Sequence, residues 1–223
     1  RRTNVSIKDL PSEYEGLTIV QISDVHAGSY SDGRYIQEAV RTINSLKPQV
    51  VCITGDFVNF DVNEYRIVAH EIKNIKSEFG VFGSLGNHDH YMNDDNHRQL
   101  IRDIKKSGVN LLVNRCVDLS VNNKILKIAG VDNSGLNQNY ANLEQALTLQ
   151  VNGEKSKYVD AKTILMAHDP SYWDREVNNK SNVDLMLSGH THGGQIGIHL
   201  LNKEMSFAQI VYKQWAGLYQ NQN

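Results

Sequence analysis

Five short clusters of polar residues, each placed directly after an apolar run, contain side chains of the types that bind metal ions. Histidine, aspartate and asparagine offer imidazole nitrogen, carboxylate oxygen and amide oxygen, a mixed set that suits Mn, Fe, Zn, Ni or Co. In chain order, the candidate metal ligands are Asp24, His26, Asp56, Asn87, His168, His190 and His192. Gly86 and Gly189 stand just before ligands, where the backbone must turn sharply or approach a neighbour closely.

The spacing and number of these residues predict two metal ions. Asp24 and His26 are two positions apart, so on an extended segment both side chains point to the same side and can hold one ion. The carboxylate of Asp56 has two oxygens and can bridge two ions. Two-metal sites suit in-line displacement at phosphorus, because the ions make a bridging hydroxide available near neutral pH and neutralise charge on the phosphoryl oxygens. We therefore expect a binuclear metal-dependent hydrolase of phosphodiester, phosphomonoester or pyrophosphate bonds, with two divalent metal ions as cofactors.

A proton donor for the leaving oxygen is expected beside the metal ligands. His88 follows Asn87 and is placed to give that proton, and Asp89 could hold the His88 ring in orientation. Simpler roles stay open, with His88 as a structural neighbour of Asn87 and Asp89 as a cap on the following turn. His90 and Tyr91 either line a substrate pocket or are ordinary solvated loop residues.

The apolar runs that precede the clusters are typical of strands buried on both faces. They cover Leu17–Ser23, Gln49–Thr54, Gly80–Leu85, Thr163–Ala167 and Val183–Ser188. Apolar residues at helical spacing predict helices around Ile36–Leu46, Val62–Ile75 and Leu100–Ile104. This order of strands and helices favours an α/β fold with parallel crossovers. In such a sheet ligands bind outside the carboxyl ends of the strands, so we expect the five clusters to converge.

The segment Asn110–Val131 follows a different pattern. Its apolar residues alternate around Asn122-Asn123, which predicts a hairpin in a second sheet. Ser206–Tyr212 is expected to add more strand. No linker or internal repeat divides the sequence, so we expect residues 1–223 to form a single catalytic domain.

The charge balance gives no electrostatic footprint for nucleic acid. Lys and Arg together number 23 and Asp and Glu 25, so the net charge is -2. We therefore expect no nucleic acid as a specific partner. No stretch approaches the roughly 20 apolar residues needed to span a bilayer. We expect a soluble domain and a monomer.

The motifs D-x-H, G-D, G-N-H-D, a lone H and G-H-T-H occur in the order found in the calcineurin-like metallophosphoesterases, which the chain resembles over most of its length. The resemblance implies a four-layer α/β/β/α sandwich, in which two mixed sheets are flanked by helices. It also implies two metal sites of four ligands each that share one carboxylate, with His88 as the general acid. The first site is formed by Asp24, His26, Asp56 and His192, and the second by Asp56, Asn87, His168 and His190.

A finer resemblance rests on Gly189–Gln195 (GHTHGGQ), which is similar to the branch of bacterial phosphodiesterases and diacylglucosamine-type pyrophosphatases. Tyr212–Tyr219 (YKQWAGLY) is similar to members of that branch with N-terminal membrane segments. This implies a phosphorylated small-molecule or lipid-linked substrate, and membrane association through a segment outside this chain. Those relatives continue beyond the equivalent of Asn223, so the second sheet is expected to lack its last strands.

A catalytically inactive binding scaffold on the same fold is the alternative. Such scaffolds normally lose metal ligands, and none of the candidate ligands is missing from this sequence. A structural zinc site fits less well, because the set has many oxygens and too few thiolates. The complete ligand set therefore favours an enzyme.

Overall fold

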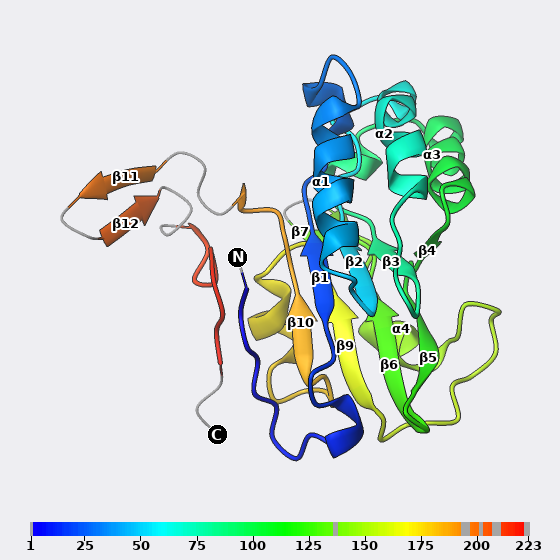
Figure 1. The fold of residues 1–223 in the computed structure, drawn as a ribbon, viewed down its shortest axis with the longest axis vertical. Coiled ribbons are helices and arrows are strands. Elements are labelled where there is room, and N and C mark those ends of the chain that lie inside the picture. The colour runs from blue at the N-terminus through cyan, green and yellow to red at the C-terminus, as the bar shows by residue number, and fades with distance from the viewer. Residues whose placement is uncertain (1, 136–137, 193–196, 201–202, 207–210, 221–223) are drawn as a thin grey trace.

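The computed structural model describes residues 2–135, 138–192, 197–200, 203–206 and 211–220. Two four-stranded sheets form its centre, and helices pack on the outer face of each sheet (Figure 1). One apolar core lies between the two sheets, and each sheet has a further apolar core between its outer face and its helices. The expected four-layer α/β/β/α sandwich is therefore confirmed.

The first sheet has only parallel pairs among its described strands. It contains β1 (Ile19–Ile22), β2 (Val50–Thr54), β3 (Val81–Ser84) and β4 (Val109–Leu111), in that order. The helices α1 (Arg34–Ser45), α2 (Arg66–Lys73) and α3 (Asp94–Lys106) connect these strands and cover one face. Short 3-10 helices lie at Ser12–Tyr14, Ala27–Ser29, Val62–Tyr65 and His88–His90. Both sheets were expected to be mixed, but among the described strands the first sheet is parallel throughout.

The second sheet is mixed and has the strand order β10-β9-β6-β5. Its strands are β5 (Arg115–Val121), β6 (Lys124–Gly130), β9 (Lys162–Met166) and β10 (Leu185–Leu187). β5 and β6 form the predicted hairpin, and Asn122 and Asn123 have φ angles of 48° and 68°, as a type I′ turn requires. The other pairs are parallel. On the outer face lie α4 (Leu143–Thr148) and the π-helical turn Trp173–Val177.

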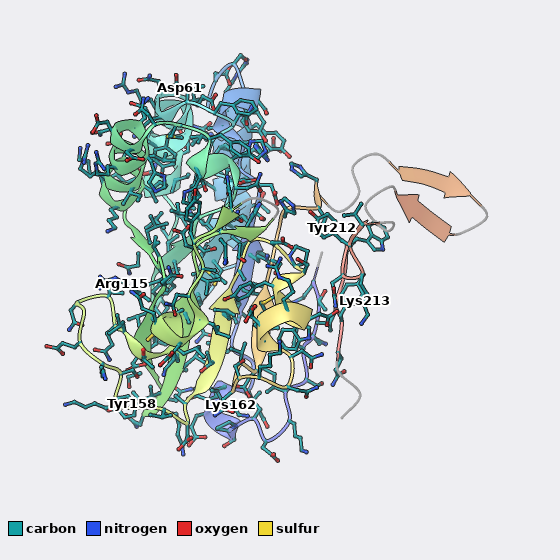
Figure 2. The ribbon with its side chains drawn as sticks, turned by 180° about the vertical axis from the view of Figure 1, so that it is seen from behind. Asp61, Arg115, Tyr158, Lys162, Tyr212 and Lys213 are labelled. Atoms are coloured by element: carbon teal, nitrogen blue, oxygen red, sulfur yellow. The ribbon has the colours of Figure 1, made fainter. Side chains whose placement is uncertain are left out.

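Two small hairpins complete the described chain. β7 (Ser134–Gly135) pairs with β8 (Gln138–Asn139), and β11 (Gly197–Leu200) pairs with β12 (Lys203–Ser206). The second hairpin projects away from both sheets (Figures 1 and 2). β12 ends at Ser206, and residues 207–210 of the expected late strand lie outside the described residues. Within the described ranges, no helix has the length and apolar character to cross a membrane.

The sequence of β2 explains how one strand contributes to two cores. Val51 and Ile53 pack with the helices of the first sheet, whereas Val50 and Cys52 pack between the two sheets. Successive side chains of a strand point to opposite faces, so a strand covered on both sides needs a continuous apolar run. All four side chains are fully buried.

Gly130, the last residue of β6, contacts the backbone that follows β4. A Cβ atom at this position would lie 2.5 Å from the carbonyl oxygen of Leu112 and 2.7 Å from its Cβ. We expect Gly130→Ala to lower the free energy of unfolding by about 1–3 kcal/mol, because the two segments must move apart. Urea unfolding measures this loss, with Ser120→Ala at an exposed position of β5 as the control. Equal stability of the two variants would contradict the assigned contact.

Candidate metal centre

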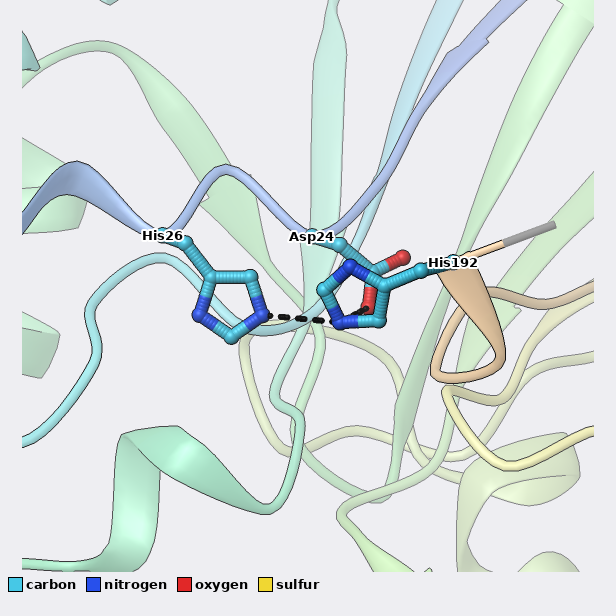
Figure 3. A group of neighbouring side chains, drawn as sticks. All are labelled: Asp24, His26 and His192. Carbon is cyan, nitrogen blue, oxygen red and sulfur yellow. Dashed lines mark hydrogen bonds and ion pairs between the residues drawn. The ribbon is translucent and has the colours of Figure 1, made fainter. Parts of the chain in front are cut away.

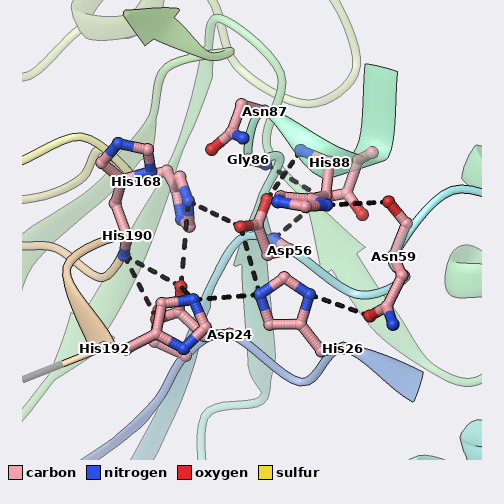
Figure 4. Close-up of polar contacts among 12 residues, drawn as sticks. Asp24, His26, Asp56, Asn59, Gly86, Asn87, His88, His168, His190 and His192 are labelled. Carbon is pink, nitrogen blue, oxygen red and sulfur yellow. Dashed lines mark hydrogen bonds and ion pairs between the residues drawn. The ribbon is translucent and has the colours of Figure 1, made fainter. Parts of the chain in front are cut away.

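All seven predicted metal ligands lie just beyond the carboxyl ends of five strands. They follow β1 (Asp24, His26), β2 (Asp56), β3 (Asn87), β9 (His168) and β10 (His190, His192). Three of these strands belong to the first sheet and two to the second, so the side chains meet where the sheets adjoin (Figure 4). A 2.7 Å hydrogen bond from His168 Nδ1 to the carbonyl oxygen of Thr54 links the two sheets at this point.

Asp24, His26 and His192 form the first group, with one ligand atom of each within 4.8 Å of the others (Figure 3). Nε2 of His192 lies 3.2 Å from His26 Nε2 and 3.5 Å from Asp24 Oδ1. Two facing imidazole nitrogens require a proton or a cation between their lone pairs. Asp56 adjoins the group, since its Oδ2 is 3.5 Å from His26 Nε2.

Asp56, His168 and His190 form the second group, under the same 4.8 Å limit. His168 Nε2 lies 3.0 Å from Asp56 Oδ2. However, unless the ring is protonated, this nitrogen presents a lone pair to the carboxylate. Both His168 Nε2 and Asn87 Oδ1 are buried, and neither has any other hydrogen-bond partner in the described part of the chain. Asn87 Nδ2 donates to the Tyr91 hydroxyl at 3.0 Å, which leaves Oδ1 as the available ligand atom. A divalent cation would satisfy both orphaned atoms, so these residues fit the predicted metal.

His88 lies between the two groups and the loop after β2. It forms a third group with His26 and Asp56, again within 4.8 Å. Its Nδ1 is 2.8 Å from the carbonyl oxygen of Asn59. Because a carbonyl oxygen only accepts, Nδ1 carries the hydrogen and Nε2 is the atom that can exchange a proton.

The backbone at the centre adopts an unusual conformation. Left-handed φ angles occur at five of the predicted ligands, namely Asp24 (54°), His26 (43°), Asp56 (54°), His190 (69°) and His192 (52°). Non-glycine residues rarely adopt this region, and such strain gathers at functional sites. Gly189 is required for a different reason, because a Cβ there would lie 1.7 Å from Ser23 Oγ. The chain is therefore shaped to bring these side chains together.

Asp89 has a different role from the one expected. It is fully buried, and its carboxylate accepts hydrogen bonds from four backbone amides rather than from the His88 ring. The donors are the amides of Asp56, Phe57, Val58 and Gly86, at 2.8–3.3 Å. Burial and the charge of Asp56 raise the pKa of Asp89 to about 7, against the opposing effect of these amides. Asp89 thus fixes the loops after β2 and β3.

Asn59 provides the orientation that was expected from Asp89. Its backbone oxygen bonds to His88, and its side-chain Oδ1 is 3.0 Å from His26 Nδ1 (Figure 4). Glu64 Oε2 accepts from the Asn59 amide at 2.5 Å. Sequence reasoning missed both residues. The one available signal was a polar side chain three positions after Asp56, which is unremarkable in a loop.

Two neighbouring contacts were also not foreseen. The hydroxyl of Tyr212, a residue of the C-terminal segment that Figure 2 labels, is 2.6 Å from Nε2 of the predicted ligand His190. His90 was a candidate for the substrate pocket, but its Nε2 is 2.7 Å from Asp132 Oδ1. The rings of His97 and Tyr140 each stack on His90 with centroids 4.5 Å away. His90 therefore packs against other side chains.

Burial and nearby carboxylates divide the histidines into two kinds. Burial lowers the pKa of His26 and of His190, which favours the neutral, ligating form of both rings. Burial also acts to lower the pKa of His168, but the hydrogen bond that a protonated ring donates to Asp56 and the negative charges of Asp56 and Asp24 outweigh it and raise that pKa to about 9. Burial acts to raise the pKa of Asp56, but the contact with His168 outweighs burial and holds that pKa below its ordinary value.

The family model of calcineurin-like phosphoesterases matches residues 17–194, and the chain belongs to this family. Membership supports metal-dependent hydrolysis of phosphoesters in general. The match includes all five motifs, from Asp24 to His192.

Curated relatives come from bacteria and animals. An uncharacterized metallophosphoesterase of Campylobacter jejuni is 30% identical over 190 residues, which cover 84% of this chain and 47% of the relative. A bovine transmembrane protein with a metallophosphoesterase domain is 30% identical, with 97% and 48% covered. Phosphodiesterase YaeI of Escherichia coli is 23% identical, with 90% and 69% covered. The chain spans about half the length of the first two.

Removal of the Asn59 side chain tests its contact with His26. We expect Asn59→Ala to weaken Mn²⁺ binding by about 10- to 100-fold, because a group that contacts the other ring nitrogen of a ligating imidazole keeps that ring in orientation. Titration with Mn²⁺ against a competing chelator measures this affinity. Asn63→Ala, at an exposed asparagine nearby in the chain, is the control. If both variants bind Mn²⁺ like the unmodified protein, the orienting role is wrong.

Proposed function

We propose that this protein hydrolyses phosphoester bonds with two divalent metal ions held on either side of Asp56. The observation that supports this most directly is that Asp56 belongs to two ligand groups, one with His168 and His190 and one with His26 and His88. It also lies 3.5 Å from the His26 nitrogen that faces His192. One buried carboxylate is thus within reach of both candidate ion positions.

The residues present suit two four-ligand sites. The first ion would be held by Asp24, His26, Asp56 and His192, and the second by Asp56, Asn87, His168 and His190. When bound, such ions supply Lewis acidity that lowers the pKa of water and neutralises charge on phosphoryl oxygens. Mn, Fe, Zn, Ni and Co all tolerate this mixture of nitrogen and oxygen ligands.

His88 is the group best placed to protonate the leaving oxygen. Its ring stands edge-on to His26 with centroids 4.7 Å apart, and its Nδ1 is occupied by the Asn59 carbonyl. Nε2 is therefore the proton-exchanging atom. The His88 amide donates to Asp56 Oδ1 at 2.9 Å, which ties this residue to the predicted bridging carboxylate. These contacts support a fixed proton donor beside the ions.

The substrate is proposed to be a phosphorylated small molecule or a lipid-linked phosphoester. Two of the relatives are named transmembrane proteins with a metallophosphoesterase domain, which supports membrane association of the whole protein through a segment outside this chain. We also propose that residues 1–223 form a single domain and that this domain is a monomer.

Turnover of para-nitrophenyl phosphate and bis-para-nitrophenyl phosphate with added Mn²⁺ tests the proposal. We expect activity from the unmodified protein. For an ester with a poor, alkyl leaving group we expect His88→Ala to lower kcat by about 10²- to 10⁴-fold, because the proton donor is removed. The loss with the para-nitrophenyl esters is smaller, because para-nitrophenolate leaves without a proton. Metal content remains near that of the unmodified protein. His70→Ala, at an exposed histidine of α2, is the control. Absence of turnover with every divalent metal tried would favour an inactive scaffold instead.

Asp56→Asn tests the bridging role. An amide offers one oxygen and no negative charge, so we expect turnover to disappear and the bound metal to fall below the content of the unmodified protein. Elemental analysis after dialysis measures the metal. Asp61→Asn makes the same chemical change at an exposed helix cap, where asparagine serves equally well. Full metal content in Asp56→Asn would refute the bridge.

A further inference from the structure

Two aromatic side chains stand exposed beside His88. Phe60 and Tyr91 are 60% and 47% exposed, although large apolar rings are usually covered. Their ring centroids lie 5.3 Å and 4.9 Å from the centroid of His88. They therefore flank the ring that the proposed function makes the proton donor.

Hydrogen bonds connect both residues to the loops around the centre. The amide of Phe60 donates to Glu64 Oε2 at 3.4 Å, the same carboxylate oxygen that accepts from the Asn59 amide. The Tyr91 hydroxyl accepts from Asn87 Nδ2 at 3.0 Å. These anchors connect both aromatic residues to residues that form or orient the metal centre. The two exposed rings thus lie beside the centre, with Tyr91 held by its hydroxyl and Phe60 through its backbone.

The arrangement of the rings indicates the shape of what they contact. Phe60 and Tyr91 are nearly parallel, with an interplanar angle of 19° and centroids 6.1 Å apart. A planar group inserted between two rings needs about 7 Å, or two carbon contacts of about 3.5 Å each. No third ring fits between them, so a ligand must lie against their outer faces. Flat aromatic faces favour other π systems in offset or edge-on contact.

We infer that Phe60 and Tyr91 form a stacking shelf for a planar leaving group, so that aryl or nucleoside phosphoesters are the preferred substrates. This inference rests on the proposed function. His88 must lie close to the leaving oxygen in order to protonate it, so the group attached to that oxygen lies beside the His88 ring. The shelf occupies that side of the centre. Leaving groups without a π system gain less from it.

The test compares two methyl phosphodiesters whose leaving alcohols have similar acidity, one phenyl and one hexafluoroisopropyl. We expect the kcat/KM ratio of phenyl to hexafluoroisopropyl ester to fall by about two- to tenfold in Phe60→Leu, the size of one aromatic contact. Phe60→Trp keeps the ratio of the unmodified protein. Tyr158→Leu also keeps it, because Tyr158 is a similarly exposed ring at the end of the molecule opposite Asp61, the neighbour of Phe60 (Figure 2).

The outcomes separate the shelf from the proposed function. If both esters are hydrolysed and their kcat/KM ratio is the same in Phe60→Leu, Tyr158→Leu and the unmodified protein, the shelf is wrong. The proposed phosphoesterase function then still stands. A fall of equal size for both esters in Phe60→Leu also overturns the shelf, because the ring then acts without regard to planarity. No turnover of either ester by the unmodified protein with any divalent metal overturns the proposed function, and the shelf with it.

Discussion

A carboxylate that is almost wholly excluded from water lies where the two sheets of this protein adjoin. Asp56 is only 1% exposed, and burying an uncompensated charge costs several kcal/mol. The surrounding groups meet that cost, since Asp56 accepts from the His88 amide and lies 3.0 Å from His168 Nε2. His168 comes from the second sheet and Asp56 from the first. The candidate metal centre is therefore built around a buried charge that contacts both sheets, at the edge of the apolar core between them.

Around that carboxylate, the chain places polar groups in conformations that only a well-fixed framework can maintain. The left-handed backbone at Asp56 coincides with the point where Asp89 accepts from its amide and from the next two. A single buried side chain thus determines the path of the loop, and four amides compensate its burial. Asn59 then continues from this loop to fix two histidines. The proposed proton donor and one predicted ligand are oriented by a residue that would not itself bind metal.

The apolar runs predicted an α/β fold whose candidate ligands converge at one edge, whereas the four-layer sandwich and the division of the ligands between two ions were implied by the family resemblance. Strands covered on both faces need continuous apolar runs, and their carboxyl ends share one edge, so Asp24 and His168 could be placed together from the pattern alone. The start of Asn110–Val131 was wrongly assigned to the second sheet, because β4 (Val109–Leu111) pairs with β3 in the first sheet. A strand of three residues directly after a helix is too short for its pattern to show which sheet it joins. Asp89 was misassigned since its role depends on amides brought together by loop conformation. Nor does spacing reveal Tyr212, whose contact with His190 depends on the path of the C-terminal segment.

In the proposed centre, one ion lies on each side of Asp56. Diffraction from crystals of this protein grown with Mn²⁺, measured for anomalous scattering, tests this arrangement most directly. We expect two anomalous peaks about 3.5–4 Å apart with an Asp56 oxygen near both, one beside His26 and His192 and the other beside His168 and Asn87. A single peak, or two peaks that do not share Asp56, would contradict it.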